Sequence, residues 1–355
     1  MNKVLHLFKS SQFTEDFVTT VNKFSINSVH SFMIYGTSFL PADYGYLFAD
    51  NIRYIPIILY ELQKPGIVEY FDSFDKIIYH GIFENYILDF FYRNSNLLKK
   101  LYLYFWGGDI PPLGTEDEKN IKKKIISKAK GIVTIIDSDY DKIVDLYNPS
   151  GKKYCLQYCA EKQLQNMKEY LFPHKEKCSK EEIVIQIGNS ATDTNNHIDV
   201  LNFLQKFKNE NIKIFLPLAY GNPQYAEKVI AYAENIFEDK VFSIRKMMKV
   251  EEYIKKLREV DIGIFAMNRQ QALGNIYMLG MNGCKLYINR NGQIDKHLSK
   301  QLHCSVSYID EIQQLEFSKF ISISQNERMN NYKQILKINE TEYKMKKWNE
   351  FFEEE

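Results

Sequence analysis

IGIFAMNRQQALGNIYMLG, residues 262–280, is the stretch of sequence that decides the fold. Its apolar start, residues 262–265, is typical of a buried strand, and a polar turn separates it from a helical pattern that ends near Gly280. A strand end followed by a helix start can hold a phosphate in an α/β domain, because backbone N–H groups at a helix N-terminus attract anions. We therefore predict an anion-binding turn, in which Gly274 lets a ligand approach closely and the Arg269 guanidinium pairs with two phosphate oxygens.

Short apolar runs alternate with amphipathic stretches along the chain, which indicates βα units and parallel sheets. Strands of a first set are expected at residues 4–8, 31–35, 54–57, 76–80, 101–106 and 131–136. A second set is expected at 183–188, 212–218, 241–244, 260–266 and 285–289. Helices are expected at 85–93 in the first set and at 199–209, 223–237 and 250–258 in the second. This pattern predicts two Rossmann-like, doubly wound α/β domains.

The length of 355 residues exceeds what one hydrophobic core usually organises, which also favours two domains. The polar segment 161–180 marks the expected boundary, with a first domain of residues 1–165 and a second of residues 166–325. Residues 326–355 are expected to end in a closing helix over residues 331–352, with Trp348, Phe351 and Phe352 as apolar anchors. This helix either returns to the first domain or is an ordinary terminal helix that covers a core.

The composition excludes several functional classes. Lys+Arg 46 against Asp+Glu 45 leaves a net charge of +1, so a nucleic-acid partner bound by bulk charge is not expected. Five scattered cysteines without a CxxC pair indicate a reduced compartment and argue against a zinc site. No apolar window approaches ~18 residues, so we expect a protein that is soluble or bound to one face of a membrane.

Three further loops are expected at the carboxyl edge of the second sheet, where open α/β sheets bind ligands. They are Gly188-Asn189-Ser190, the loop with Tyr220 and Gly221, and Asn289-Arg290-Asn291-Gly292. If the strands are parallel and adjacent, these loops converge with the turn at Arg269. Gly-Asn-Ser is by itself a common turn, so the convergence is what favours a binding site.

Two side chains of the first domain could serve as acid or base. His80 ends the strand expected at residues 76–80, and Asp109 follows Trp106-Gly107-Gly108. A histidine exchanges protons near neutral pH, and a carboxylate after two glycines can approach a substrate hydroxyl closely. Both also have ordinary interpretations, a structural histidine and an aspartate that caps a turn.

Residues 119–130 contain six lysines interleaved with Ile121, Ile125, Ile126 and Ala129. One face of the expected helix is therefore apolar and the others are cationic, which suits the anionic headgroups of a membrane surface. The alternative is a solvated helix that packs its apolar face on the first domain.

Taken together, these blocks resemble a known family. Trp106-Gly107-Gly108-Asp109, His80-Gly81, Ile187-Gly188-Asn189-Ser190 with Asn196-His197-Ile198, and Arg269-Gln270-Gln271 with Gly274 are similar to the 4-acetamido-4,6-dideoxygalactosyltransferases of enterobacterial common antigen synthesis, glycosyltransferase family 56. The resemblance implies a GT-B fold, with two Rossmann-like domains that face a cleft. It also implies a dTDP-sugar donor in the second domain and a polyprenyl-diphosphate-linked saccharide as acceptor.

The resulting hypothesis is a glycosyltransferase of bacterial surface polysaccharide synthesis, cytoplasmic and peripheral on the inner face of the plasma membrane. Donor binding is expected from Gly188, Asn189, Ser190, Tyr220, Arg269, Gln270, Gln271, Gly274 and Asn275, and acid or base catalysis from Asp109 or His80. No metal is expected, because fixed donors can stabilise a leaving diphosphate and no Asp-x-Asp motif is placed to bind a cation. The alternatives are a sugar-nucleotide epimerase of the same fold and a non-catalytic nucleotide-binding protein.

Overall fold

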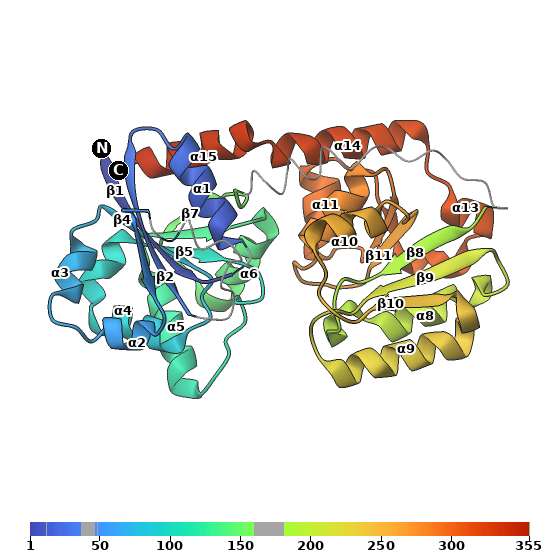
Figure 1. The fold of residues 1–355 in the computed structure, drawn as a ribbon, viewed down its shortest axis with the longest axis horizontal. Helices are drawn as coiled ribbons and strands as arrows, with labels where there is room; N and C mark the ends of the chain where they lie inside the picture. Colours follow the sequence, from blue (N-terminus) through green and yellow to red (C-terminus); the bar gives the residue numbers. More distant parts are fainter. Residues whose placement is uncertain (12, 37–46, 48, 160–180, 355) are drawn as a thin grey trace. The chain divides into compact units, whose positions relative to one another are not determined.

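The computed structural model of the chain describes residues 1–11, 13–36, 47, 49–159 and 181–354. The chain divides into two compact α/β units (Figure 1). Unit 1 contains residues 1–164 and 339–355, and unit 2 contains residues 165–338. The segment 161–180, where the sequence predicts the domain boundary, lies outside the described residues.

Unit 1 is built on a seven-stranded sheet in which every neighbouring pair is parallel. Its strands are β1 (Asn2–Lys9), β2 (Ser28–Tyr35), β3 (Ile52–Ile55), β4 (Lys76–His80), β5 (Leu101–Phe105), β6 (Gly131–Thr134) and β7 (Lys152–Cys155). They lie in the order β3-β2-β1-β4-β5-β6-β7, so the order reverses between β1 and β4. The five-residue strands β4 and β5 are buried throughout, as expected for parallel strands covered on both faces.

Helices cover both faces of this sheet (Figure 1). They are α1 (Thr14–Phe24), α2 (Ile58–Glu61), α3 (Ile67–Asp72), α4 (Asn85–Arg93), η2 (Ser95–Lys100), α5 (Glu116–Lys128), α6 (Asp137–Tyr147) and α15 (Thr341–Glu353). Alternate residues of the strands point to opposite faces: Leu5 and Leu7 of β1 join the core under α2 to α6, whereas Val4 and Phe8 join the core under α1 and α15.

Unit 2 repeats this architecture with a six-stranded parallel sheet. Its strands are β8 (Ile183–Ile187), β9 (Ile212–Pro217), β10 (Val241–Ile244), β11 (Ile262–Phe265), β12 (Lys285–Ile288) and β13 (Ser307–Tyr308). They lie in the order β10-β9-β8-β11-β12-β13, with the reversal between β8 and β11. The predicted fold class, two doubly wound parallel α/β domains, is confirmed; β7 and β13 at the sheet edges were not predicted.

The helices of unit 2 also lie on both faces of its sheet (Figure 1). They are η3 (Asp193–Asn195), α8 (His197–Leu204), η4 (Gln205–Phe207), α9 (Pro223–Phe237), η5 (Glu238–Lys240), α10 (Val250–Leu257), α11 (Leu273–Met281), α12 (Gln293–Asp295), η6 (Lys296–Gln301), η7 (Ile309–Gln314), α13 (Phe317–Ile321) and α14 (Gln325–Asn339). Gly280 of α11 faces α14, because a Cβ there would meet the end of the Ile335 side chain.

The C-terminal segment forms two helices where the sequence predicts one. Glu340 has an extended backbone, with φ −61° and ψ 132°, and separates α14 from α15. Helix α15 packs on unit 1, where Trp348 is fully buried and its Nε1 donates a hydrogen bond to Gln157 O at 2.9 Å. A second bond joins Asn2 Nδ2 of β1 to Phe352 O at 2.8 Å, so the end of the chain closes one face of the first sheet.

Two further features concern the described residues alone. No helix there is both long enough and apolar enough to span a membrane. Cys155, Cys159 and Cys304 are free thiols.

Candidate functional site

The strand order of unit 2 reverses between β8 and β11, and the predicted turns lie at the carboxyl ends of these two strands. Residues 188–190 follow β8, and residues 269–271 follow β11 after a short connection. Tyr220 follows β9, the neighbour of β8. Connections leave such a switch point on opposite faces of the sheet, which opens the crevice where α/β proteins bind ligands. The predicted residues thus lie where the topology of unit 2 favours a ligand.

Hydrogen bonds join the three loops to one another. Gln271 Nε2 donates to Asn189 Oδ1 at 3.1 Å, and Asn189 Nδ2 donates to Tyr220 Oη at 2.6 Å. Gln271 in turn accepts from Thr194 Oγ1 at 2.9 Å. The predicted convergence of these loops is therefore present, with Gln271 as its centre. Tyr220 keeps half of its surface exposed at the edge of the cluster.

Gly188 is required by geometry in this cluster. Its φ of +63° lies in the left-handed region, and a Cβ would lie 2.7 Å from Asn195 Oδ1 and 2.8 Å from His197 Nε2. Asn195, which is fully buried, accepts a bond from the Asn189 N–H at 3.2 Å and donates to Ser190 O at 3.0 Å. The absence of a side chain at Gly188 therefore lets Asn195 lie against the loop and hydrogen-bond to it. Asn195 was not among the residues predicted from the sequence.

The first turn of α11 presents unpaired positive charge. Ala272 precedes the helix in a left-handed conformation, with φ 62°, and its side chain makes no capping bond. Gly274 is exposed, and Arg269 forms no ion pair or hydrogen bond within the part of the chain that the structure describes. Burial raises the pKa of Tyr220, and the hydrogen bonds of Ser190 and Asn189 and the charge of Arg269 oppose this shift. A helix start with free N–H groups beside an arginine is a site for an anion.

Gln270 and Asn275 have different surroundings from Arg269. Gln270 is buried, and its backbone N–H donates to Gln293 Oε1 at 3.0 Å, so it anchors the turn to α12. Asn275 lies on the first turn of α11 and contacts Tyr253 of α10 and Gln186 of β8. Tyr253 and Gln186 were not predicted from the sequence. The signal for Gln186 was a single polar residue inside the apolar strand IVIQI.

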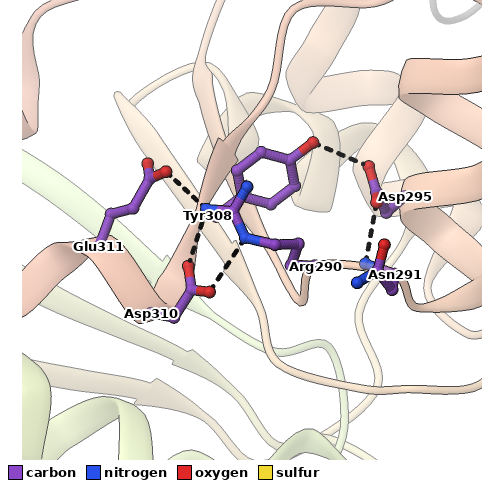
Figure 2. A network of polar contacts seen from close by, with 6 residues as sticks. All are labelled: Arg290, Asn291, Asp295, Tyr308, Asp310 and Glu311. Carbon is purple, nitrogen blue, oxygen red and sulfur yellow. Dashed lines mark hydrogen bonds and ion pairs between the residues drawn. The ribbon is translucent and has the colours of Figure 1, made fainter.

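The fourth predicted loop contains an arginine whose charge is already paired. Arg290 Nε and Nη2 lie 3.0 and 3.2 Å from the two carboxylate oxygens of Asp310, and Nη2 lies 2.5 Å from Glu311 (Figure 2). Its guanidinium also stacks on Tyr308, 3.7 Å from the ring centre, and Tyr308 Oη donates to Asp295 at 3.1 Å. Arg290 therefore ties the β12 loop to the start of η7. Of the two arginines in these loops, Arg269 is the one without a carboxylate partner among the described residues.

A pocket of about 290 Å³ opens at the same carboxyl edge, beside α8. It is lined by Asn196, Asp199, Val200, Asn202, Phe203, Ala266, Asn289 and Ile309. Asn196 and Asn289 both donate their Nδ2 to Ala266 O, at 2.6 and 2.8 Å. None of the predicted donor-binding residues lines this pocket.

In unit 1, His80 lies inside the protein. Its Nε2 lies 3.0 Å from His6 Nδ1, and His6 Nε2 lies 3.0 Å from His30 Nδ1. The His80 ring stacks on Phe8 with centroids 3.8 Å apart. Burial lowers the pKa of His80 well below its ordinary value, so the imidazole stays neutral. This environment favours a structural role, and a catalytic role of His80 stays a prediction.

Asp109 is also buried and serves the backbone around it. Its two carboxylate oxygens accept the N–H groups of Ile82 and Trp106, each at 2.8 Å. Burial raises its pKa, and these two bonds oppose the shift. Lys122 Nζ donates to the backbone oxygens of Asp109 and, at 3.0 Å, Pro111. Asp109 thus joins the loops after β4 and β5, and its assignment as acid or base stays a prediction.

The lysine-rich segment forms α5, and its apolar face is used by the core of unit 1. Ile125, Ile126 and Ala129 are buried there, with Ile121 packed against them. The helix starts with a capping box between Thr115 and Glu118. The lysines at positions 123, 124, 128 and 130 remain exposed. The expected amphipathic helix is therefore present, but its apolar side contacts protein, and the lysines lie on its exposed side together with Glu116 and Asp117.

Comparison with known proteins identifies the family. A family profile described as 4-alpha-L-fucosyltransferase, glycosyl transferase group 56, matches residues 141–353, more than half of the chain. The match includes all of unit 2 that the structure describes, and so every predicted donor-binding residue. The family resemblance that the sequence motifs predicted is confirmed.

Solved structures share the fold at low sequence identity. A glycosyltransferase from Rickettsia africae has a TM-score of 0.66 at 13% identity, over 99% of this chain and 97% of that one. A sucrose-phosphate synthase from Thermosynechococcus elongatus has 0.66 at 9%, over 99% and 98%. A UDP-forming alpha,alpha-trehalose-phosphate synthase from Burkholderia xenovorans has 0.64 at 9%, over 99% and 98%. These similarities cover both units and show the GT-B type of fold.

Proposed function

The chain belongs to glycosyltransferase family 56, and from this premise we propose that it transfers a deoxyamino sugar from a dTDP-linked donor to a polyprenyl-diphosphate-linked saccharide. Family membership makes the protein a sugar transferase with a nucleotide-sugar donor. The base, the sugar and the lipid-linked acceptor are the proposed part. Bacterial surface polysaccharide synthesis is the process in which such an acceptor is used.

The observation that carries the proposal is the unpaired Arg269 beside the uncapped first turn of α11. The donor diphosphate binds Arg269 and the N–H groups of that turn, which includes Gly274 and Asn275. The nucleoside extends toward residues 188–190 and the exposed ring of Tyr220. The hydrogen bond from Gln271 to Asn189 connects the diphosphate part of the site to the nucleoside part.

Transfer breaks the bond between the anomeric carbon and the phosphate oxygen, and forms a bond from that carbon to an acceptor oxygen. The acceptor loses a proton to a base, and the leaving nucleoside diphosphate takes the bonding electrons. Arg269 and the α11 amides stabilise this negative charge, and fixed donors of this kind are usually the largest catalytic term. We propose that they do so without a metal.

The proposed acceptor partner requires a site in unit 1 and access to a lipid. Asp109 and His80 are the predicted acid or base there. Both side chains are buried, so a catalytic role requires that the acceptor reaches them. The exposed lysines of α5 suit the anionic inner surface of the plasma membrane, where a polyprenyl-linked saccharide is anchored. We propose this peripheral, cytoplasmic location for the protein.

A thermal-shift screen with dTDP, UDP, GDP and CMP tests the donor assignment. A ligand that binds only the folded state raises the melting temperature, and we expect the largest rise with dTDP. A transfer assay then uses the matching dTDP-sugar with and without a polyprenyl-diphosphate-linked acceptor. Donor consumption that needs the acceptor supports the proposal. Donor conversion without any acceptor would indicate an epimerase, and no shift with any nucleotide would contradict the donor site.

A further inference from the structure

The side-chain oxygen of Asn275 accepts two hydrogen bonds. One comes from Tyr253 Oη on α10, and the other from Gln186 Nε2 on β8 at 3.1 Å. The orientation of the Gln186 amide follows from a second bond, because its Nε2 also donates to Gly188 O at 2.9 Å. A backbone carbonyl only accepts, so it requires the NH₂ end of the glutamine. That NH₂ group in turn requires the oxygen end of Asn275.

Tyr253 supports the same orientation. Burial raises the pKa of its phenol, so the hydroxyl stays protonated and can donate. With its oxygen engaged by two donors, Asn275 turns its NH₂ group the other way. Within the described residues this Nδ2 has no hydrogen-bond partner. It is also not one of the fully enclosed polar atoms, so it can be reached by a ligand. The first turn of α11 therefore carries an accessible side-chain donor beside its free backbone N–H groups.

Folding alone does not account for Gln186. The residue is fully buried between apolar neighbours of β8, and its Oε1 has no partner in the described part of the chain. An unpaired buried acceptor is unfavourable for stability, and an apolar side chain would suit this strand better. What the glutamine does provide is a donor that links the carbonyl of the Gly188 loop to Asn275.

We propose that Gln186 and Tyr253 are positioning residues that hold the Asn275 NH₂ group toward the donor diphosphate, where it donates a hydrogen bond to a phosphate oxygen. The inference rests on the proposed function and adds to it the residues that orient one phosphate contact. An asparagine that is free to rotate has to be ordered when the phosphate binds, whereas one held by Gln186 and Tyr253 already presents its NH₂ group.

Asn275→Asp tests the contact, because it replaces only the NH₂ group. The oxygen that faces Tyr253 and Gln186 is retained, so the melting temperature should stay unchanged. Titration calorimetry should show dTDP binding at least tenfold weaker than in the wild type, since one hydrogen bond to a charged group is lost and a repulsion is gained. Thymidine binding should change less than about twofold. Asn235→Asp, on the exposed side of α9, is the matched control and should not affect either ligand.

A double-mutant cycle tests the positioning. Tyr253→Phe should weaken dTDP binding about threefold to tenfold in the wild-type background and have no effect when Asn275→Ala is already present. Gln186→Glu should act in the same direction, because a carboxylate facing Asn275 attracts its NH₂ group away from the ligand. The inference is overturned if Tyr253→Phe has the same effect in both backgrounds, or if Asn275→Asp binds dTDP as tightly as the wild type. In either case, binding of dTDP by the wild type would still support the proposed donor site. If the wild type binds no nucleoside diphosphate, the proposed function fails and the inference with it.

Discussion

Arg269 and Arg290 show how the surroundings of one residue type decide its chemistry. Both follow strands of unit 2 at the carboxyl edge. Arg290 is held by Asp310, Glu311 and the Tyr308 ring, so an incoming anion would have to displace two carboxylates (Figure 2). Arg269 has no carboxylate partner in the described residues and lies beside the start of α11. The planar fork of a guanidinium binds phosphate in two-pronged fashion only when it is unoccupied.

Arg269→Ala should therefore weaken binding of a nucleoside diphosphate, by about tenfold to a hundredfold, since a hydrogen-bonded charge pair contributes ~1.5–3 kcal/mol. Arg290→Ala is the matched control, and it should change the affinity less than about threefold because its charge is already neutralised. Titration calorimetry measures both. A larger loss in Arg290→Ala than in Arg269→Ala would show that the diphosphate binds at the β12 loop instead.

The substitution Asp109→Asn tests whether the role of Asp109 is structural or catalytic. The carboxylate accepts the N–H of Ile82 with one oxygen and that of Trp106 with the other. An asparagine keeps one acceptor and places an NH₂ group against the second N–H, which should cost about 1–3 kcal/mol of folding free energy. Denaturant unfolding measures this cost, and nucleotide binding should be unaffected. Full stability with greatly slowed sugar transfer would instead identify Asp109 as the acid or base.

At the level of the elements, three neighbouring strands of unit 1 are linked by histidines. His30 of β2, His6 of β1 and His80 of β4 form a hydrogen-bonded row, which His30 Nε2 extends to Ser25 Oγ at 2.6 Å. Phe17 of α1 and Phe352 of α15 cover the row. Burial lowers the pKa of His30 to about 4, and lowers those of His6 and His80 well below 6.5. The row is therefore neutral when the protein is folded.

This row predicts acid instability with a definite sign. The unfolded chain binds protons below pH 6.5 that the folded chain does not, so stability is complete above 6.5 and is lost as the pH falls toward 4. In that window, each histidine should lower the free energy of unfolding by up to about 1.4 kcal/mol for each unit by which the pH falls. His30→Gln should flatten the dependence of the melting temperature on pH. His303→Asn is the control, an exposed position whose left-handed backbone suits asparagine. An equal slope in wild type and His30→Gln would contradict this account.

The sequence predicted the central strands and strand-end loops because both follow from local pattern. Apolar runs mark buried parallel strands, and the carboxyl ends of such strands meet at one edge, which brought Asn189, Tyr220 and Gln271 together. Edge strand β13 has two residues and leaves no such pattern. The break between α14 and α15 at Glu340 has neither glycine nor proline to mark it. Contacts such as Gln186 with Asn275 and Tyr253 depend on three elements that only the tertiary fold brings together.

At the scale of the whole molecule, charge is balanced overall and uneven locally. The net charge of +1 hides the exposed lysines of α5, which lie on the outside of unit 1 because the isoleucines of the same helix enter the core. Glu116 and Asp117 at the start of the helix reduce the local positive potential. If α5 attaches the protein to a membrane, it does so through the charges of its lysines, because its apolar side chains are inside unit 1. Salt screens such electrostatic binding.

The protein should therefore bind vesicles of phosphatidylglycerol and phosphatidylcholine at low ionic strength and release them as salt approaches ~0.15 M, where the Debye length is about 8 Å. Reversing the charge at Lys123, Lys124 and Lys128 to glutamate should lower the partition coefficient at least tenfold, since each lysine near an anionic surface contributes about 1 kcal/mol. The matched control reverses three exposed lysines of unit 2, Lys228, Lys255 and Lys333, and should bind like the wild type. Vesicle sedimentation measures all three proteins. Binding that survives high salt, or that the unit 2 control loses equally, would mean that α5 does not mediate attachment.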